Sequence, residues 1–122
     1  MTSTCNADSI IVSGDKSAAL KQLIKNSGST PVYVFFFSPT CPHCITLNDA
    51  FQKYRAQCQA RNAKATLIIV NLQRSPELFQ EYKISSFPQV MVYRNGKRIK
   101  HIIGADFPAL ESAFRIANIQ IE

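Results

Sequence analysis

Six consecutive apolar residues, Val32–Phe37, stand just before two cysteines spaced three apart, Cys41 and Cys44. The apolar run has the length and aromatic content of a strand that is buried on both faces, as in the middle of a sheet. After the second cysteine, apolar residues such as Leu47 and Phe51 recur at helical spacing. The sequence therefore predicts that the cysteine pair opens a helix directly after a central strand.

The rest of the chain alternates between strand and helix patterns. We expect strands at about residues 10–12, 32–37, 66–70, 89–93 and 98–103, and helices at about residues 16–26, 42–61, 76–82 and 107–116. Asn95 and Gly96 predict a two-residue hairpin turn between the last two strands. The order βαβαβαββα predicts an α/β fold, in which helices flank a central mixed sheet.

Length and composition favour one globular domain over residues 1–122. A chain of 122 residues with 46% hydrophobic residues can form one ordinary core. The polar residues 1–8 are expected to form a mobile tail. No apolar run reaches the ~20 residues of a membrane span, so no membrane association is expected. The first residues lack the pattern of a secretory signal, so the predicted location is cytoplasmic.

The net charge of +6 permits binding to acidic partners without specifying any. Basic residues gather in the expected hairpin, where such a run usually forms a solvated face or protects a sheet edge; they are Arg94, Lys97, Arg98 and Lys100. Binding of nucleic acid is not favoured, because only Tyr93 offers a stacking aromatic there.

Two thiols at positions i and i+3 of a helix start lie about 5 to 6 Å apart at Cα, which a disulfide can bridge. Free N–H groups and the helix dipole stabilise a thiolate on Cys41, while Cys44 points into the helix. Cys41 is thus predicted to attack and Cys44 to resolve. His43 adds to the stabilisation of the thiolate, and Pro42 fixes the turn.

Two other interpretations of the pair stay open. A structural zinc site needs four ligands, and only the isolated Cys5, Cys58 and His101 could complete one. Alternatively, the pair is an inert helix start with ordinary buried thiols. The redox interpretation requires no metal and no organic cofactor.

With these motifs the chain resembles the thioredoxin family from Ile10 to about Ala117. The resemblance rests on the Cys-Pro-His-Cys sequence, on Phe87-Pro88 before a strand, on Asn95-Gly96 and on Gly104. It implies a thioredoxin fold, with a cis bond before Pro88 and a substrate segment held by the Phe87 backbone and near Gly104. The alternatives are a trans turn proline and a plain glycine at a strand end.

The chain also departs from the family at four positions. Thr40 stands where thioredoxins carry Trp, and we count it with Phe87, Pro88 and Gly104 as a substrate-binding position. Pro42-His43 replaces Gly-Pro, Asp49 replaces the helix-kinking proline, and Phe35 with Ile69 replaces a buried Asp and its Lys partner. The missing acid weakens the expectation of efficient reductase turnover. Cys-Pro-His-Cys is itself similar to the active site of the bacterial periplasmic disulfide oxidase.

The predicted function is thiol–disulfide exchange on protein disulfides, through a mixed disulfide at Cys41 that Cys44 resolves. An unidentified reductase or glutathione would recycle the pair. Reduction potentials in the family span about −270 mV for thioredoxin to about −120 mV for the bacterial periplasmic disulfide oxidase. His43 predicts a reduction potential above that of thioredoxin. The rival hypothesis is a thioredoxin-fold binding module that turns over little.

The other cysteines and the histidine of the last strand receive ordinary interpretations. Cys58 falls on the apolar stripe of the long helix and is expected to be a packed core thiol. Cys5, in the polar tail, is expected to be a passive exposed thiol, and the alternative is that it forms intermolecular disulfides or adducts. His101, in the middle of a strand, is expected to be a satisfied or surface histidine.

Overall fold

The computed structural model describes residues 5–9 and 16–119, and side chains from residue 18. Within these residues, nine elements follow one another in the predicted order. They are β1 (Cys5–Ser9), α1 (Lys16–Asn26), β2 (Val32–Phe37), α2 (Pro42–Ala60), β3 (Ala65–Asn71), α3 (Pro76–Glu81), β4 (Gln89–Arg94), β5 (Lys97–Ile103) and α4 (Phe107–Arg115). The α/β architecture and its order are confirmed.

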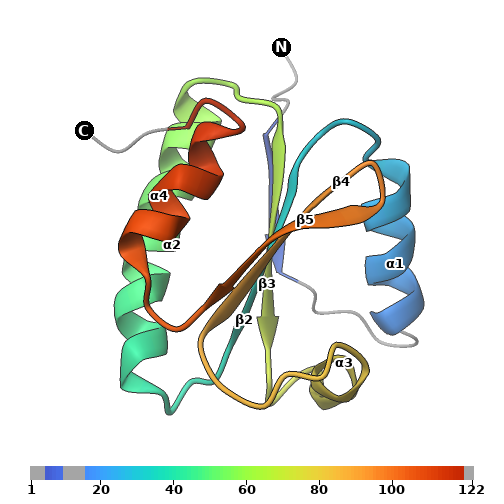
Figure 1. Ribbon diagram of the computed structural model, residues 1–122, viewed down its shortest axis with the longest axis vertical. Coiled ribbons are helices and arrows are strands. Elements are labelled where there is room, and N and C mark those ends of the chain that lie inside the picture. The colour runs from blue at the N-terminus through green and yellow to red at the C-terminus, as the bar shows by residue number, and fades with distance from the viewer. Residues whose placement is uncertain (1–4, 10–15, 120–122) are drawn as a thin grey trace.

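The strands form one mixed sheet in the order β1-β3-β2-β4-β5 (Figure 1). β2 lies in the middle, parallel to β3 and antiparallel to β4. Its residues from Val32 to Phe36 are buried, as expected for an apolar strand with neighbours on both sides and cover on both faces. The antiparallel hairpin of β4 and β5 completes the sheet.

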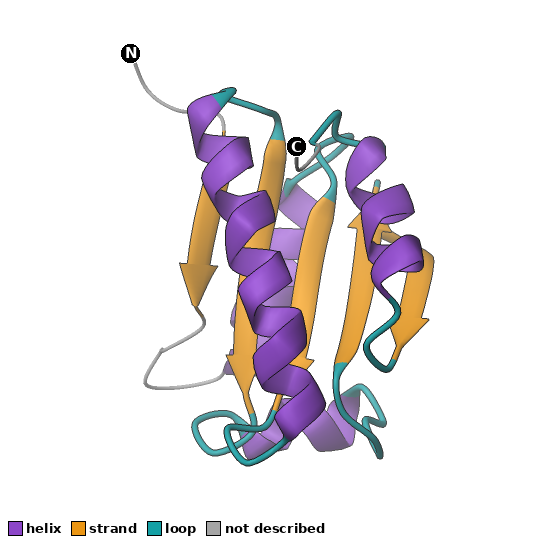
Figure 2. Cartoon of the chain, turned by 90° about the vertical axis from the view of Figure 1, so that its left-hand side faces the viewer, coloured by secondary structure: helices purple, strands orange, loops and turns teal. Residues whose placement is uncertain are grey.

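Helices cover both faces of the sheet. α2 and α4 lie on one face and α1 and α3 on the other, as Figure 1 shows, and Figure 2 views the face with α2 and α4. Under α2 and α4, the Phe114 ring stacks between Tyr33 and Tyr54, with centroid distances of 4.3 and 4.1 Å. The hydroxyl of Tyr33 donates to the carbonyl of Ala113 at 2.7 Å. These contacts join β2, α2 and α4 into one core.

The first strand lies earlier than the sequence predicts. The expected strand at residues 10–12 falls outside the described residues, while Cys5–Ser9 pairs in parallel with β3 from Ala65 to Ile69. Residues 5–8 were expected to belong to a mobile tail, and that prediction is wrong for them. The segment has low intrinsic strand propensity, so pairing with β3 provides its order instead.

The hairpin turn agrees with the prediction. Asn95 and Gly96 both adopt positive φ, 54° and 76°, as a two-residue turn between twisted strands requires. Residues 97–101 of β5 are exposed, so the basic residues of this edge strand are solvated. Charged side chains on an edge discourage pairing with other chains.

Candidate active site

Cys41 lies at the N-terminal cap of α2, four residues after β2 ends. Its backbone is extended, with φ −93° and ψ 115°, and Pro42 occupies the first turn of the helix. A proline is tolerated there because its missing N–H has no partner within the helix in any case. The backbone N–H of Cys41 donates to the Ser38 carbonyl at 3.1 Å, which closes the turn between strand and helix.

The two thiols of this helix start are free, but their surroundings differ. Cys41 is half-buried, and its Sγ accepts a hydrogen bond from the backbone N–H of Cys44 at 3.2 Å. Cys44 is fully buried beneath it. One sulfur is therefore accessible to a partner molecule, and the other can be approached only through the first.

Burial raises the pKa of the Cys44 thiol above its ordinary value, and its hydrogen bond with Cys41 raises it further. The backbone of Ser38 acts in the opposite direction. None of these groups is a carboxylate. Phe35, at one of the positions where thioredoxins carry the buried acid and its partner, is part of the apolar core, and Asp49 is exposed. Cys44 is thus a protonated thiol at neutral pH.

The neighbours of Cys41 form an open rim. Thr40, Pro42 and His43 are exposed. The hydroxyls of Thr40 and Ser38 lie 3.1 Å apart, which orients the Thr40 side chain toward the turn. A threonine at this position leaves the accessible face of Cys41 without the broad aromatic cover that a tryptophan would give.

The peptide bond between Phe87 and Pro88 is cis, as the resemblance implies. The next residue, Gln89, pairs with Phe36 of β2, so the register brings Pro88 beside the end of β2 that leads to Cys41. The Pro88 carbonyl accepts from the N–H of Gly104 at 2.8 Å, and Gly104 has a φ of 80° that favours glycine. The fold therefore places Pro88 and Gly104 together at this end of the sheet.

Phe87 is anchored on one side and open on the other. Its ring packs on Phe79, with centroids 5.3 Å apart, and remains half-buried. Within residues 16–119, no backbone hydrogen bond involves the N–H or C=O of Phe87. An extended segment of another protein can pair with these groups as a strand does.

The sequence interpretation did not find a polar network behind this loop. The Gln89 side chain contacts both Ser86 and His101. His101 is thus a satisfied histidine, as predicted, but its partner was not foreseen. The usable signal was the hairpin register set by Asn95-Gly96, which brings the start of β4 close to His101.

Cys58 requires a correction. It is completely buried, as predicted, but it is disulfide-bonded and not a free core thiol. Neither Cys41 nor Cys44 is its partner, since both are free. Hydrophobic spacing predicts the burial of a cysteine and carries no information on its pairing. A disulfide-bonded sulfur is also unsuited to bind zinc, since zinc takes thiolate ligands.

No metal-binding cluster of three or more His, Cys, Asp or Glu side chains occurs in the described part of the chain.

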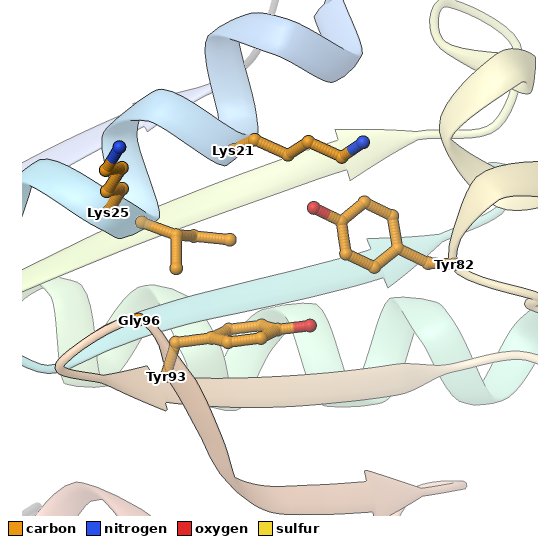
Figure 3. Close-up of a pocket in the computed structure, with 6 residues that line it drawn as sticks. Lys21, Lys25, Tyr82, Tyr93 and Gly96 are labelled. Atoms are coloured by element: carbon orange, nitrogen blue, oxygen red, sulfur yellow. The ribbon is translucent and has the colours of Figure 1, made fainter.

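A hollow of about 340 Å³ lies on the face of the sheet that α1 and α3 cover, between α1, the end of α3 and the hairpin (Figure 3). It is lined by Lys21, Ile24, Lys25, Tyr82, Tyr93 and Gly96. At its rim Lys21 Nζ pairs with Glu81 Oε1 at 2.5 Å. The hollow shares no residue with the dithiol site.

Comparison with known proteins agrees with this geometry. The family model described as thioredoxin matches residues 11–115. The chain belongs to the thioredoxin family. It is 30% identical over 100 residues to an M-type chloroplastic thioredoxin of Chlamydomonas reinhardtii, covering 80% of this chain and 69% of that protein. The chemistry of this family is thiol–disulfide exchange, and the chain carries the free pair that such exchange requires.

Other relatives show where the similarity ends. Bovine glutaredoxin-3 is 24% identical over 104 residues, which are 85% of this chain but only 30% of that longer protein. Among solved structures, thioredoxin from Malassezia sympodialis superposes with a TM-score of 0.74 at 23% identity, covering 92% of this chain and 90% of that one. A reduced thioredoxin of Schistosoma mansoni gives 0.73 at 21%. These structures establish the fold.

Proposed function

We propose that this thioredoxin-family protein catalyses thiol–disulfide exchange on protein disulfides, with Cys41 as the attacking thiol and Cys44 as the resolving thiol. The observation that carries the proposal is the asymmetry of the pair. The accessible Cys41 Sγ accepts a hydrogen bond from the backbone N–H of Cys44 in the first turn of α2, and the buried Cys44 thiol lies directly behind it. N–H groups and a helix dipole stabilise negative charge on sulfur at that position.

In the first step the Cys41 thiolate attacks one sulfur of a substrate disulfide. A Cys41–substrate bond forms, the substrate S–S bond breaks, and the other substrate sulfur leaves as a thiolate. The N–H of Cys44 loses a charged acceptor when Cys41 enters the mixed disulfide. This hydrogen bond therefore stabilises the reduced pair relative to the mixed disulfide.

In the second step Cys44 attacks Cys41 Sγ. The Cys41–Cys44 bond forms, the Cys41–substrate bond breaks, and the second substrate sulfur leaves as a thiolate. The proton of Cys44 must leave first, and the raised pKa of this thiol opposes this. No carboxylate acts on Cys44 within the described structure, so the substrate thiolate released in the first step takes that proton. We therefore expect a long-lived mixed disulfide. Two electrons from an unidentified reductase or from glutathione return the pair to the dithiol.

The proposed substrate seat combines Thr40, Phe87, Pro88 and Gly104. The free backbone groups of Phe87 would pair with an extended substrate segment, and Gly104, without a side chain, leaves room beside Pro88. Pro88 offers no N–H that would compete for the substrate. His43 is exposed beside Cys41, where its protonated form would favour the thiolate, and Pro42 holds the turn.

The cytoplasmic location stays a prediction. No helix in the described residues is long and apolar enough to cross a membrane. The disulfide at Cys58 is more typical of an oxidising compartment, where the pair would work as an oxidant or isomerase. Fractionation with a thiol-blocking reagent present from lysis separates the two cases, because it preserves the redox state of Cys58.

The test is reduction of a protein disulfide, with insulin as the substrate and dithiothreitol as the electron source. Wild type should accelerate the reaction, and Cys41→Ser should not. Cys44→Ser should accumulate a mixed disulfide that non-reducing electrophoresis detects. Retained partner binding without turnover in the wild type would favour a binding module instead.

A further inference from the structure

Gln89 is a buried polar residue immediately after the proline of the proposed substrate seat. Only 4% of its surface is exposed, although it begins the strand β4. Its Nε2 lies 3.1 Å from the carbonyl oxygen of Ser86 and 3.2 Å from the Ser86 hydroxyl. A buried amide of this kind is costly unless its hydrogen-bonding groups are satisfied. The amide nitrogen of Gln89 therefore fixes Ser86, the residue before Phe87, through these two hydrogen bonds.

The direction of these hydrogen bonds determines the tautomer of His101. The Ser86 carbonyl can only accept, so the Gln89 nitrogen must face it and the Gln89 Oε1 must face the other way. That oxygen lies 2.6 Å from His101 Nε2. Because an amide oxygen only accepts, Nε2 of His101 must carry a proton and donate it. Partial desolvation of the ring by Gln89 and its other neighbours, together with the nearby Arg98, lowers the pKa of His101, which favours the neutral ring with this one N–H.

The network connects the edge strand with the loop before β4. His101 lies on β5, opposite Met91 in the hairpin register. On the same strand pair, Gly104 donates to the Pro88 carbonyl at 2.8 Å. Ser86 and Pro88 are thus held from two sides, and the Phe87 backbone lies between them without a hydrogen bond of its own in the described chain. Fixing both neighbours orders these free groups before a substrate arrives, which lowers the cost of binding.

We propose that His101, acting through Gln89, is a positioning residue that holds Ser86, Phe87 and Pro88 in the conformation that binds substrate. The inference rests on the proposed function, because it assigns a partner-binding role to the Phe87 backbone. His101 touches neither sulfur of the pair. Its loss should weaken substrate binding and leave the chemistry of the sulfurs unchanged.

The experiment compares His101→Leu, which removes the donor, with His101→Gln, whose Nε2 can reach the same oxygen. With a peptide disulfide as substrate, His101→Leu should raise KM about two- to tenfold, the range expected for one lost hydrogen bond, with kcat nearly unchanged. His101→Gln should restore KM. The equilibrium of the Cys41–Cys44 pair with glutathione should be the same in all three proteins.

Two further variants separate positioning from a general effect on the fold. Lys100→Leu makes the same kind of change on the neighbouring exposed position of β5, and it should keep the wild-type KM. Gln89→Glu keeps an acceptor for His101 but removes both donors to Ser86. Its KM should rise as in His101→Leu, and adding His101→Leu to it should change KM little further. The backbone NMR signals of Ser86 and Phe87 should shift in both variants.

Each remaining outcome decides against the proposal. An active wild type whose KM is unaffected by His101→Leu would overturn the positioning role and leave the proposed function standing. The same holds if His101→Gln fails to restore KM, or if the glutathione equilibrium moves with KM. A wild type that reduces no disulfide would overturn the proposed function, and this inference with it.

Discussion

Cys44 and Cys58 are two cysteines of the same helix, equally buried and opposite in state. Both are completely inaccessible, and α2 places them 14 residues apart, about 21 Å along its axis. Cys44 is a free thiol behind the accessible Cys41, whereas Cys58 is disulfide-bonded. Burial therefore does not decide whether a cysteine reacts. The difference is that Cys44 lies behind the accessible Cys41 at the open start of the helix, so that a substrate bound to Cys41 comes within its reach.

The largest expected effect tests which end of α2 carries the chemistry. Cys41→Ser should reduce disulfide turnover at least about 10³-fold, because it removes the attacking sulfur. The matched variant, Cys58→Ala, should keep turnover within about twofold of wild type. Insulin reduction measures both, and comparable losses in the two variants would end the distinction between the helix ends.

The next effect concerns stability, for which the Cys58 variant should have the larger effect and the Cys41 variant the smaller. Cys58→Ala should lower the free energy of unfolding by about 2–4 kcal/mol, as loss of a native disulfide does. Cys41→Ser should have a much smaller effect, since Cys41 is half-buried and unpaired by any disulfide. Urea unfolding without reductant measures both values. Peptide mapping of the unreduced protein identifies the partner of Cys58, and a Cys58 peptide without a cross-link would contradict the comparison.

A third prediction concerns redox potentials. The Cys41–Cys44 pair should equilibrate with glutathione above about −270 mV, and the Cys58 disulfide should lie below about −300 mV, as structural disulfides do. A gap of 30 mV corresponds to about 1.4 kcal/mol. Stepwise titration with reductant, followed by alkylation and mass spectrometry, should show the active pair opening first. A single common transition would show that the two sites are not distinct.

The smallest effect is the response of Cys44 to pH. Burial, the largest cause of its raised pKa, remains when Cys41 is replaced. Alkylation of Cys44 in the Cys41→Ser protein should therefore be slow at pH 7 and should accelerate well above pH 8.5, the ordinary thiol value. The sign for stability is also defined. Because the unfolded chain loses this proton at lower pH than the folded one, stability falls as pH rises above about 8.5. Cys58 should remain unmodified throughout, and its alkylation in the folded protein would contradict this.

Local sequence signals predicted those parts of the fold that local physics determines. The apolar run of β2, the proline at the start of α2 and the Asn95-Gly96 turn each have a short-range cause, and the structure contains all three. Family resemblance added the cis bond at Pro88, which no local pattern specifies. The positions of Thr40, Phe87 and Gly104 followed from the same resemblance, while their roles stay predictions.

The features that the sequence did not predict depend on contacts between distant residues. β1 has a weak pattern of its own and is ordered by its pairing with β3. The state of Cys58 depends on which thiol lies near it after folding. The link between Gln89 and His101 spans 12 residues and requires the hairpin register before it becomes visible. In each case a pair of residues, and not a periodic pattern, carries the information.

The stack of Tyr33, Phe114 and Tyr54 has a practical consequence for optical spectroscopy. The chain contains no tryptophan, so its four tyrosines give the main near-ultraviolet signal. Burial raises the pKa of all four phenols. Tyr33 and Tyr54 lie directly against the ring of Phe114 in α4. Near-ultraviolet circular dichroism should therefore report the docking of α4 on the sheet. Tyrosinate absorbance in an alkaline titration should appear as the core opens, which provides a label-free measure of unfolding.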